Sequence, residues 1–229
     1  GSCALKVATT ANDNTAVGKS SLTANTSGTG NVSIGNAMEA NTEGNDNTAL
    51  GNGSLQTNTT GDNNTALGRL ALKSNTTACN NTAVGFCSLF TNTTGASNTA
   101  VGRFSMIANT TGASNTALGT NALDANTTGG DNVAVGVSAL SANTTGVNNT
   151  AVGHRTLISA TTANNNTALG RDAACSLTTG LQNVAVGNCA LSTNTEAHNN
   201  VAVGFCSQKS STTGTLNVSA GSFTLEDNT

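Results

Sequence analysis

The sequence predicts an all-β fold: a parallel β-solenoid, or β-roll, of about 13 coils. A pentapeptide resembling Asn-Thr-Ala-Val-Gly begins at thirteen positions, from Asn14 to Asn217, at intervals of 17 residues except for one interval of 16 after Asn31. Fixed periods of this length are typical of repeat architectures. Large core side chains are scarce, because the chain has no Trp, Tyr or Pro, only 5 Phe and 8% charged residues, which argues against a globular domain.

Residues 1–229 are predicted to form a single repeat domain. We number the unit from its Asn, so that the consensus N-T-A-V-G-x-x-A-L-x-S-N-T-T-G-x-x occupies positions 1 to 17. The residues before Asn14 follow the same pattern, with Ala4 and Leu5 at positions 8 and 9. The sequence starts and stops in mid-coil, whereas solenoids normally need atypical capping repeats. We therefore expect a segment of a longer fibre, with Gly1-Ser2 left from a cloning site.

Positions 2 to 4 are expected to form a strand in which positions 2 and 4 share one face. Position 4 is Val, Leu or Ile in every unit except at Ala220, and position 2 is Thr or Val. These β-branched and aliphatic side chains predict that this face is buried in the coil's own core. Position 9, which is Leu or Met in most units, is expected to supply a second inward aliphatic side chain.

Position 3 is Ala in eleven units and Ser in two, so the opposite face of the strand is restricted too. A position facing water would also accept Lys, Glu or Gln. A strand buried on both faces needs more than its own coil to cover it. The sequence therefore predicts several copies of the chain around a common axis. The expected contacts between chains are Ala16, Ala49, Ala66, Ala83, Ala100, Ala117, Ala134, Ala151, Ala168, Ala185 and Ala202.

Two corners are expected in each unit. Position 5 is Gly in all thirteen units, from Gly18 to Gly221, which indicates a positive φ or a backbone approach too close for a Cβ. The Asn-Thr-Thr-Gly run at positions 12 to 15 indicates the end of a second strand and a second corner. Stacking identical coils at about 4.7–4.8 Å places Asn on Asn and Thr on Thr, so we expect hydrogen-bonded ladders along the axis.

The unit NTAVGxxALxxNTTGxxN resembles the repeats of phage-type tail-fibre proteins, and it is similar to the head repeats of YadA-like trimeric autotransporter adhesins. The resemblance covers the whole chain, although the adhesin repeat is shorter and the Tyr residues common in tail-fibre repeats are absent. It implies a left-handed parallel β-roll assembled as a homotrimer. It also implies that Thr48, Leu50 and Leu55 lie in a subunit's own core and that Ala49 faces the trimer contact.

The charge of the chain bears on its partners. The net charge is −3 and the pI is about 5.1, so no basic surface is expected for nucleic acid or anionic lipid. No apolar run approaches the roughly 18 residues of a membrane-spanning helix, so we expect no membrane insertion. The expected partner is the chain itself, as a homotrimer, together with a host-surface receptor or glycan.

No motif points to catalysis, and we expect a protein that is not an enzyme and needs no cofactor or metal. The six Cys residues form no zinc-binding spacing, although Cys189 and Cys206 fall one coil apart in the same column, where a stacked contact or a disulfide is conceivable. His154 and His198 occupy unrelated positions and are expected at the surface. Acidic residues such as Asp62 and Asp124 lie at variable positions, where solvation is the expected role.

Variable outward positions carry the candidate surface contacts. Exposed aromatic and Arg side chains on an otherwise uniform coil indicate a receptor or glycan contact, and packing between neighbouring chains explains them equally well. The candidates are Phe86, Phe90, Arg103, Phe104, Ile107, His154, Arg155 and Phe205.

The function predicted from these features is structural. We expect a segment of an extracellular fibre, on a virion tail or a cell surface, that acts as a stiff spacer and presents a contact surface. An alternative is an ice-binding solenoid whose Thr columns at positions 13 and 14 match an ice lattice, although Glu43 and Glu196 interrupt the second column. A polysaccharide-cleaving β-helix would need clustered acids or bases on one face, and the aligned columns contain no such cluster.

Overall fold

The computed structural model describes residues 1–210 and 212–225. The chain forms two compact units, Gly1–Ser114 and Asn115–Thr229, which are described separately below. Both units are all-β, as predicted, and each is a stack of parallel coils with one short strand per coil. The described residues contain no helix that is long and apolar enough to cross a membrane.

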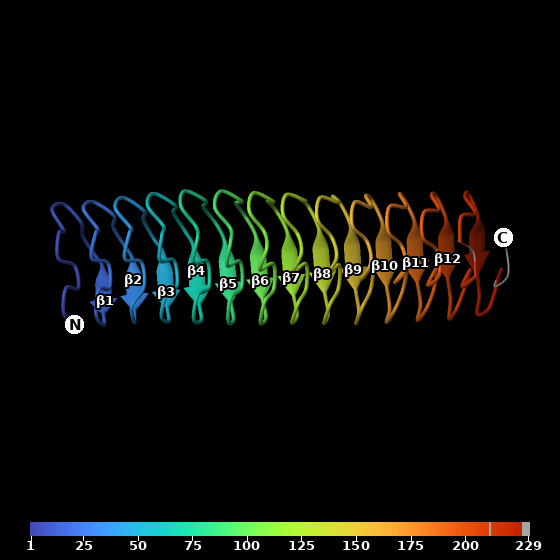
Figure 1. The fold of residues 1–229 in the computed structure, drawn as a ribbon, viewed down its shortest axis with the longest axis horizontal. Helices are drawn as coiled ribbons and strands as arrows, with labels where there is room; N and C mark the ends of the chain where they lie inside the picture. Colours follow the sequence, from blue (N-terminus) through green and yellow to red (C-terminus); the bar gives the residue numbers. More distant parts are fainter. Residues whose placement is uncertain (211, 226–229) are drawn as a thin grey trace. The chain divides into compact units, whose positions relative to one another are not determined.

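The first unit stacks six strands in chain order. Each strand pairs in parallel with the next, and the register places every residue opposite its equivalent in the following repeat, as with Ala49 and Ala66. Figure 1 shows these strands, coloured blue to green, pointing the same way. The strands are β1 (Thr15–Val17), β2 (Val32–Ile34), β3 (Thr48–Leu50), β4 (Thr65–Leu67), β5 (Thr82–Val84) and β6 (Thr99–Val101).

The described residues of the second unit repeat this arrangement with seven strands in chain order. The register again matches equivalent positions, as with Ala151 and Ala168. The strands are β7 (Thr116–Leu118), β8 (Val133–Val135), β9 (Thr150–Val152), β10 (Thr167–Leu169), β11 (Val184–Val186), β12 (Val201–Val203) and β13 (Val218–Ala220).

The corner after each strand has the geometry expected of glycine. Gly51 has a φ of 127°, and a Cβ built on it would lie 2.8 Å from the backbone of Gly68 in the next coil. Both the left-handed conformation and the close approach therefore exclude a side chain. The predicted second strand is wrong, because among the described residues positions 6 to 15 form turns and bends, with left-handed residues at positions 7 and 9 such as Leu70 and Leu72.

The strand faces point opposite to the prediction. Ala49 has 0% exposure and lies inside its own coil, whereas Leu50 is 46% exposed and Thr48 is half-buried on the outer face. From Ala49 to Ala202 every Ala at position 3 is buried within its own unit, and Ala16 in the first coil is half-buried. The prediction that the Ala column contacts a sister chain is therefore wrong, because a buried methyl group offers no surface to a partner.

The interior is narrow, which explains the inward alanines. Small side chains at positions 3 and 8 face inward, and one larger aliphatic side chain at position 9 fills the remaining space. Leu55, Leu72 and Leu89 illustrate this last group, and all three are fully buried, which confirms the expectation for position 9. Buried Ser33 replaces Ala in the second coil and donates its hydroxyl hydrogen to the carbonyl of Ala37 at 3.0 Å.

Two buried columns of Asn close the core, which confirms the predicted ladders. At position 12, Nδ2 of Asn75 donates to Oδ1 of Asn58 in the preceding coil at 2.8 Å and to the carbonyl of Ala78 at 3.0 Å. At position 1, Nδ2 of Asn64 donates to the same carbonyl at 2.8 Å and to Oδ1 of Asn47 at 3.1 Å. Each position-15 carbonyl in this pattern accepts two side-chain amides, so the buried polar groups satisfy one another.

The position-12 ladder is interrupted in the second unit. Ala160 and Leu177 stand where the repeat calls for Asn. On one side of the gap Oδ1 of Asn143 has no hydrogen-bond partner, and on the other side Nδ2 of Asn194 has none. Each atom would meet the missing Asn of the adjacent coil, so the two orphaned groups mark the two ends of one break.

Candidate interaction surfaces

The outer sheet face, which we define as positions 2 and 4 of the strands, presents a row of exposed aliphatic side chains. In the first unit Val17, Ile34, Leu50 and Val101 are between 37% and 55% exposed. In the second unit Leu118, Leu169 and Val203 are also exposed. No position-4 residue is buried in either unit. Contiguous apolar surface of this kind is uncommon on a monomer and is typical of contact sites.

A second surface gathers cations and aromatic rings on three successive coils of the first unit. The Arg69 guanidinium lies 5.6 Å from the centre of the Phe86 ring, and the rings of Phe86 and Phe104 are 5.5 Å apart. Arg103 lies 4.1 Å from the centre of the Phe104 ring. Burial raises the pKa of the Cys87 thiol, and Arg69, Lys73 and Arg103 all lie close enough to this thiol to counter that shift in part. We call this surface the basic aromatic patch, and its residues are Arg69, Lys73, Phe86, Phe90, Arg103 and Phe104.

The cations of this patch face rings rather than carboxylates. Lys73 lies 5.3 Å from the centre of the Phe90 ring, so each cation contacts a π face. Residues 63–123 contain no Asp or Glu and three cations, which gives this segment a charge of +3 in a chain whose net charge is −3. In the part of the chain that the structure describes, no carboxylate pairs with Arg69, Lys73 or Arg103.

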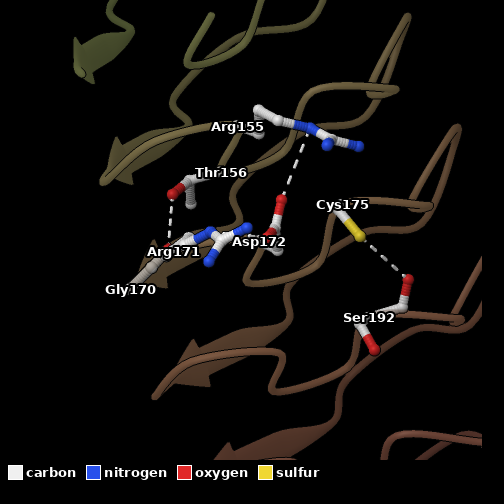
Figure 2. A network of polar contacts seen from close by, with 7 residues as sticks. All are labelled: Arg155, Thr156, Gly170, Arg171, Asp172, Cys175 and Ser192. Carbon is white, nitrogen blue, oxygen red and sulfur yellow. Dashed lines mark hydrogen bonds and ion pairs between the residues drawn. The ribbon is translucent and has the colours of Figure 1, made fainter. Parts of the chain in front are cut away.

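The arginines of the second unit are instead paired. Nε of Arg155 lies 3.4 Å from Oδ1 of Asp172 in the next coil, and Nε of Arg171 lies 3.1 Å from Oδ2 of the same carboxylate. Figure 2 shows Arg155 reaching across the coils to Asp172, close to the hydrogen bond from the Thr156 hydroxyl to the Gly170 carbonyl. Because Asp172 neutralises one of the two guanidinium groups, this cluster has less free positive charge than the patch in the first unit.

The remaining predicted surface residues are dispersed. Ile107 and Phe90 are half-buried, and His154 is exposed. Phe205 is exposed and packs edge-on against Phe223 with ring centres 5.2 Å apart. The structure thus brings together Phe86, Phe90, Arg103 and Phe104, and it adds Arg69 and Lys73, which sequence reasoning missed. The sequence feature that could have identified these two cations is the absence of Asp and Glu from residues 63–123.

The cysteines are free thiols, and five of the six are at least partly buried. Burial raises the pKa of the Cys189 thiol, and the neighbouring Cys206 contributes to the same effect. The structure therefore shows the stacked contact between Cys189 and Cys206 without a disulfide. Cys175 donates to the carbonyl of Ser192 at 3.3 Å, as Figure 2 shows.

Side chains at position 16 have a structural role that the sequence analysis missed. Oδ1 of Asp62 accepts a hydrogen bond of 2.7 Å from the backbone N–H of Asn45, and Nδ1 of His198 accepts one of 2.9 Å from the N–H of Leu181. The expectation that Asp62 serves solvation and that His198 is a surface residue is therefore incomplete, since both cap the backbone of the preceding coil. The sequence feature that could have predicted this capping is the frequency of side chains with a hydrogen-bond acceptor at position 16.

Asp124 is a half-buried acid outside that column. Desolvation raises the pKa of its carboxyl group, and its own backbone N–H and that of Ala125 counter the shift in part. Oδ1 of Asp124 and Oδ1 of the nearby Asn121 have no hydrogen-bond partner. Residues 1–210 and 212–225 contain no pocket and no group of three or more His, Cys, Asp and Glu placed to hold a metal ion.

Comparisons with known proteins identify no relative. No family model, no curated protein and no solved structure matches the chain.

Proposed function

We propose that the chain is a segment of a homotrimeric extracellular fibre, of the tail-fibre or surface-adhesin type, that acts as a stiff spacer and carries a contact surface. The observation that carries the proposal is the exposed aliphatic row of the outer sheet face. Burying an aliphatic side chain of this size contributes about 1.5–3 kcal/mol, so a row repeated in every coil favours association. A left-handed coil is part of the proposal and rests on the resemblance to adhesin heads.

A second copy is the natural cover for this face. The aliphatic groups recur once per coil, at the strand spacing of about 4.8 Å, and another copy carries the same period. The aliphatic rows of two chains therefore remain aligned, coil by coil, along the whole of each unit, whereas the apolar groups of an unrelated surface would align with only a few coils. The contact thus uses positions 2 and 4 instead of the alanines.

The mechanical role follows from the hydrogen bonds between coils. Strand pairing, the Asn ladders and the Thr column join successive coils, apart from the break in the position-12 ladder of the second unit; in the Thr column, for example, the hydroxyl of Thr76 donates to the carbonyl of Thr93 at 3.1 Å. Bending a unit separates these groups on one side. Because the coils contact only their neighbours, stiffness accumulates with each added coil.

The mass of the protein in solution tests the proposal. Size-exclusion chromatography with light scattering is expected to give three times the mass of one chain. The variant Leu50→Lys with Val101→Lys, which places charge on the outer sheet face, is expected to elute as a monomer. The matched control Thr60→Lys with Thr94→Lys adds the same charge at exposed corners of the same unit and is expected to remain a trimer. A monodisperse wild-type monomer would refute the assembly.

Ice binding is a second candidate, but with different residues from those first considered. The Thr side chains at position 13 are occupied by hydrogen bonds to the next coil, and positions 13 and 14 belong to no strand. Position 2 offers a better array, because Thr48, Thr65, Thr82 and Thr99 stack in register on the outer sheet face. Thermal hysteresis from a monomeric protein would favour this reading, since a face covered by sister chains cannot contact ice.

A further inference from the structure

We propose that the basic aromatic patch binds a carboxylate-bearing oligosaccharide. The inference refines the contact surface of the proposed function by naming the residues and the chemical class of the ligand. It concerns a different surface from the outer sheet face, so the two can succeed or fail independently.

The charge of the patch points to an anionic ligand. Arg69 and Arg103 are exposed, and in the described chain neither has a carboxylate partner. In contrast, Arg155 and Arg171 share Asp172. Two guanidinium groups that are not neutralised by the protein retain donors for a ligand carboxylate, and such charge-assisted hydrogen bonds are among the stronger polar contacts.

The rings supply the apolar part of the site. Phe86 is 36% exposed, its ring lies against the Arg69 guanidinium, and it packs against the Phe104 ring, which Arg103 contacts, so the two adjoining rings offer an apolar platform. The C–H groups on the face of a pyranose ring pack against such a platform while the acidic substituent remains at the rim. Aromatic rings flanked by cations therefore match a sugar acid better than a small inorganic anion, which has no apolar face.

The patch is held in place before a ligand arrives. The N–H of Phe104 donates to the carbonyl of Phe86 at 3.0 Å, and the N–H of Cys87 donates to the carbonyl of Arg69 at 3.1 Å. These bonds join the three coils that carry the patch, and stacking on the rings restricts the arginine side chains. A site fixed in this way loses less conformational entropy on binding.

Charge density favours a sugar over a nucleic acid. A single-stranded nucleic acid carries a phosphate at every nucleotide, and stable binding needs a groove of cations along the strand. The cations of the patch are not continued along the first unit. In the column of Arg69 the two preceding coils carry Asn52 and Asn36, and in the column of Lys73 they carry Gln56 and Glu39. A dense polyanion that extended past Arg69 along the first unit would find no further cation on these two coils, whereas a short oligosaccharide needs none.

Calorimetric titration with defined probes tests the inference. The probes are a galacturonic-acid disaccharide, which is short enough to contact the patch alone, its methyl ester, which is uncharged but has nearly the same shape, and a single-stranded oligothymidylate. We expect the acid form to bind, and the ester to bind at least about tenfold more weakly, the factor that corresponds to losing one charge-assisted hydrogen bond. Equal binding of acid and ester would overturn the inference, as would absence of binding by the acid form or tighter binding of the oligothymidylate.

Variants locate the site. Arg69→Gln with Arg103→Gln is expected to weaken binding of the acid oligosaccharide at least about tenfold, while Lys19→Gln is expected to leave it unchanged. Lys19 is a matched control, because it is an exposed cation at the same repeat position but has no aromatic neighbour in the described structure. Unchanged binding by the double variant would overturn the assignment of the patch. Light scattering on the same samples reports the trimer separately.

Discussion

Removing one amide from the Asn ladder tests whether polar groups hold this core together. Asn92 is fully buried at position 12 of the fifth coil in the first unit. Its Nδ2 donates to Oδ1 of Asn75 at 3.1 Å and to the carbonyl of Gly95 at 2.9 Å. Its Oδ1 accepts from Nδ2 of Asn109 at 2.8 Å. The substitution Asn92→Ala removes all three hydrogen bonds without adding bulk.

The magnitude follows from the partners that remain. The Gly95 carbonyl still accepts from Nδ2 of Asn81 at 3.0 Å, and Asn109 still donates to the carbonyl of Gly112 at 2.9 Å. Oδ1 of Asn75 is left buried with no donor from the next coil. One orphaned acceptor costs about 1–3 kcal/mol and the other lost bonds about 1 kcal/mol together, so we expect a loss of about 2–4 kcal/mol in the free energy of unfolding.

Urea unfolding followed by circular dichroism measures this loss, and amide hydrogen exchange localises it. We expect the faster exchange to be confined to the coils next to Asn92, because each coil depends on its neighbours. Thr94→Ala is the matched control, since Thr94 is exposed in the same coil and the change is expected to stay within about 0.5 kcal/mol. If Asn92→Ala costs no more than this control, the ladder does not stabilise the core.

Three further predictions follow from burial and hydrogen bonding. Ala100→Leu overfills the narrow interior and is expected to lower the free energy of unfolding by about 1–3 kcal/mol, whereas Val17→Thr on the outer face of the same unit is expected to change that of a single chain by less than about 0.5 kcal/mol. Urea unfolding of both variants in the monomeric Leu50→Lys, Val101→Lys background checks the pair, and equal losses would contradict the inward direction of Ala100. Ala160→Asn combined with Leu177→Asn bridges the break in the ladder, so a double-mutant cycle is expected to show favourable coupling of about 1–3 kcal/mol, and strict additivity would contradict it. Because burial raises the pKa of Asp124, its charged form destabilises the folded state as the pH rises through that raised pKa. Asp124→Asn is therefore expected to raise the free energy of unfolding at neutral pH and to change it little below the unfolded pKa of 3.8. If the change in the free energy of unfolding does not depend on pH, this cause is excluded.

The period of the sequence was sufficient to predict parallel coils, their register and the ladders. A spacing of 17 residues fixes which side chains stack, and a buried Asn between two others has few partners except its equivalents. Glycine at position 5 was equally informative, because Gly51 needs both a left-handed φ and space for the next backbone. The sequence also shows that Ala160 and Leu177 interrupt the position-12 column. It does not show that Oδ1 of Asn143 and Nδ2 of Asn194 are left without hydrogen-bond partners.

The direction of the strand could not be predicted from the pattern alone. Alternation shows that positions 2 and 4 share a face and position 3 takes the other, but it is the same for either orientation. The prediction chose the larger side chains for the interior, as in an ordinary core. The choice was wrong because residues with left-handed φ at positions 7 and 9, such as Leu70 and Leu72, fold the return segment close to the strand and leave room only for Ala49 and Ala66.

The candidate site was predictable only in part. Phe86 and Phe104 could be placed on adjacent coils from their positions in the unit, and they do pack together. Arg69 and Lys73 were overlooked because each is unremarkable within its own repeat. Their significance appears only when three coils are stacked, which brings Arg69 onto Phe86 and Lys73 onto Phe90.

The outward position of the large aliphatic side chains bears most directly on function. Inside the coil, Ala at position 3, Leu at position 9 and the Asn ladders already fill the space, so Val, Leu or Ile at position 4 contributes little to the folding of one chain. Nevertheless twelve of the thirteen units have such a residue there. A position free to be polar in an isolated coil would carry Ser, Lys or Gln in some of them. The absence of these polar residues favours a face that is covered in the functional assembly. The covering surface must contact every coil at the same spacing, and another copy of the same repeat is the simplest surface that does so.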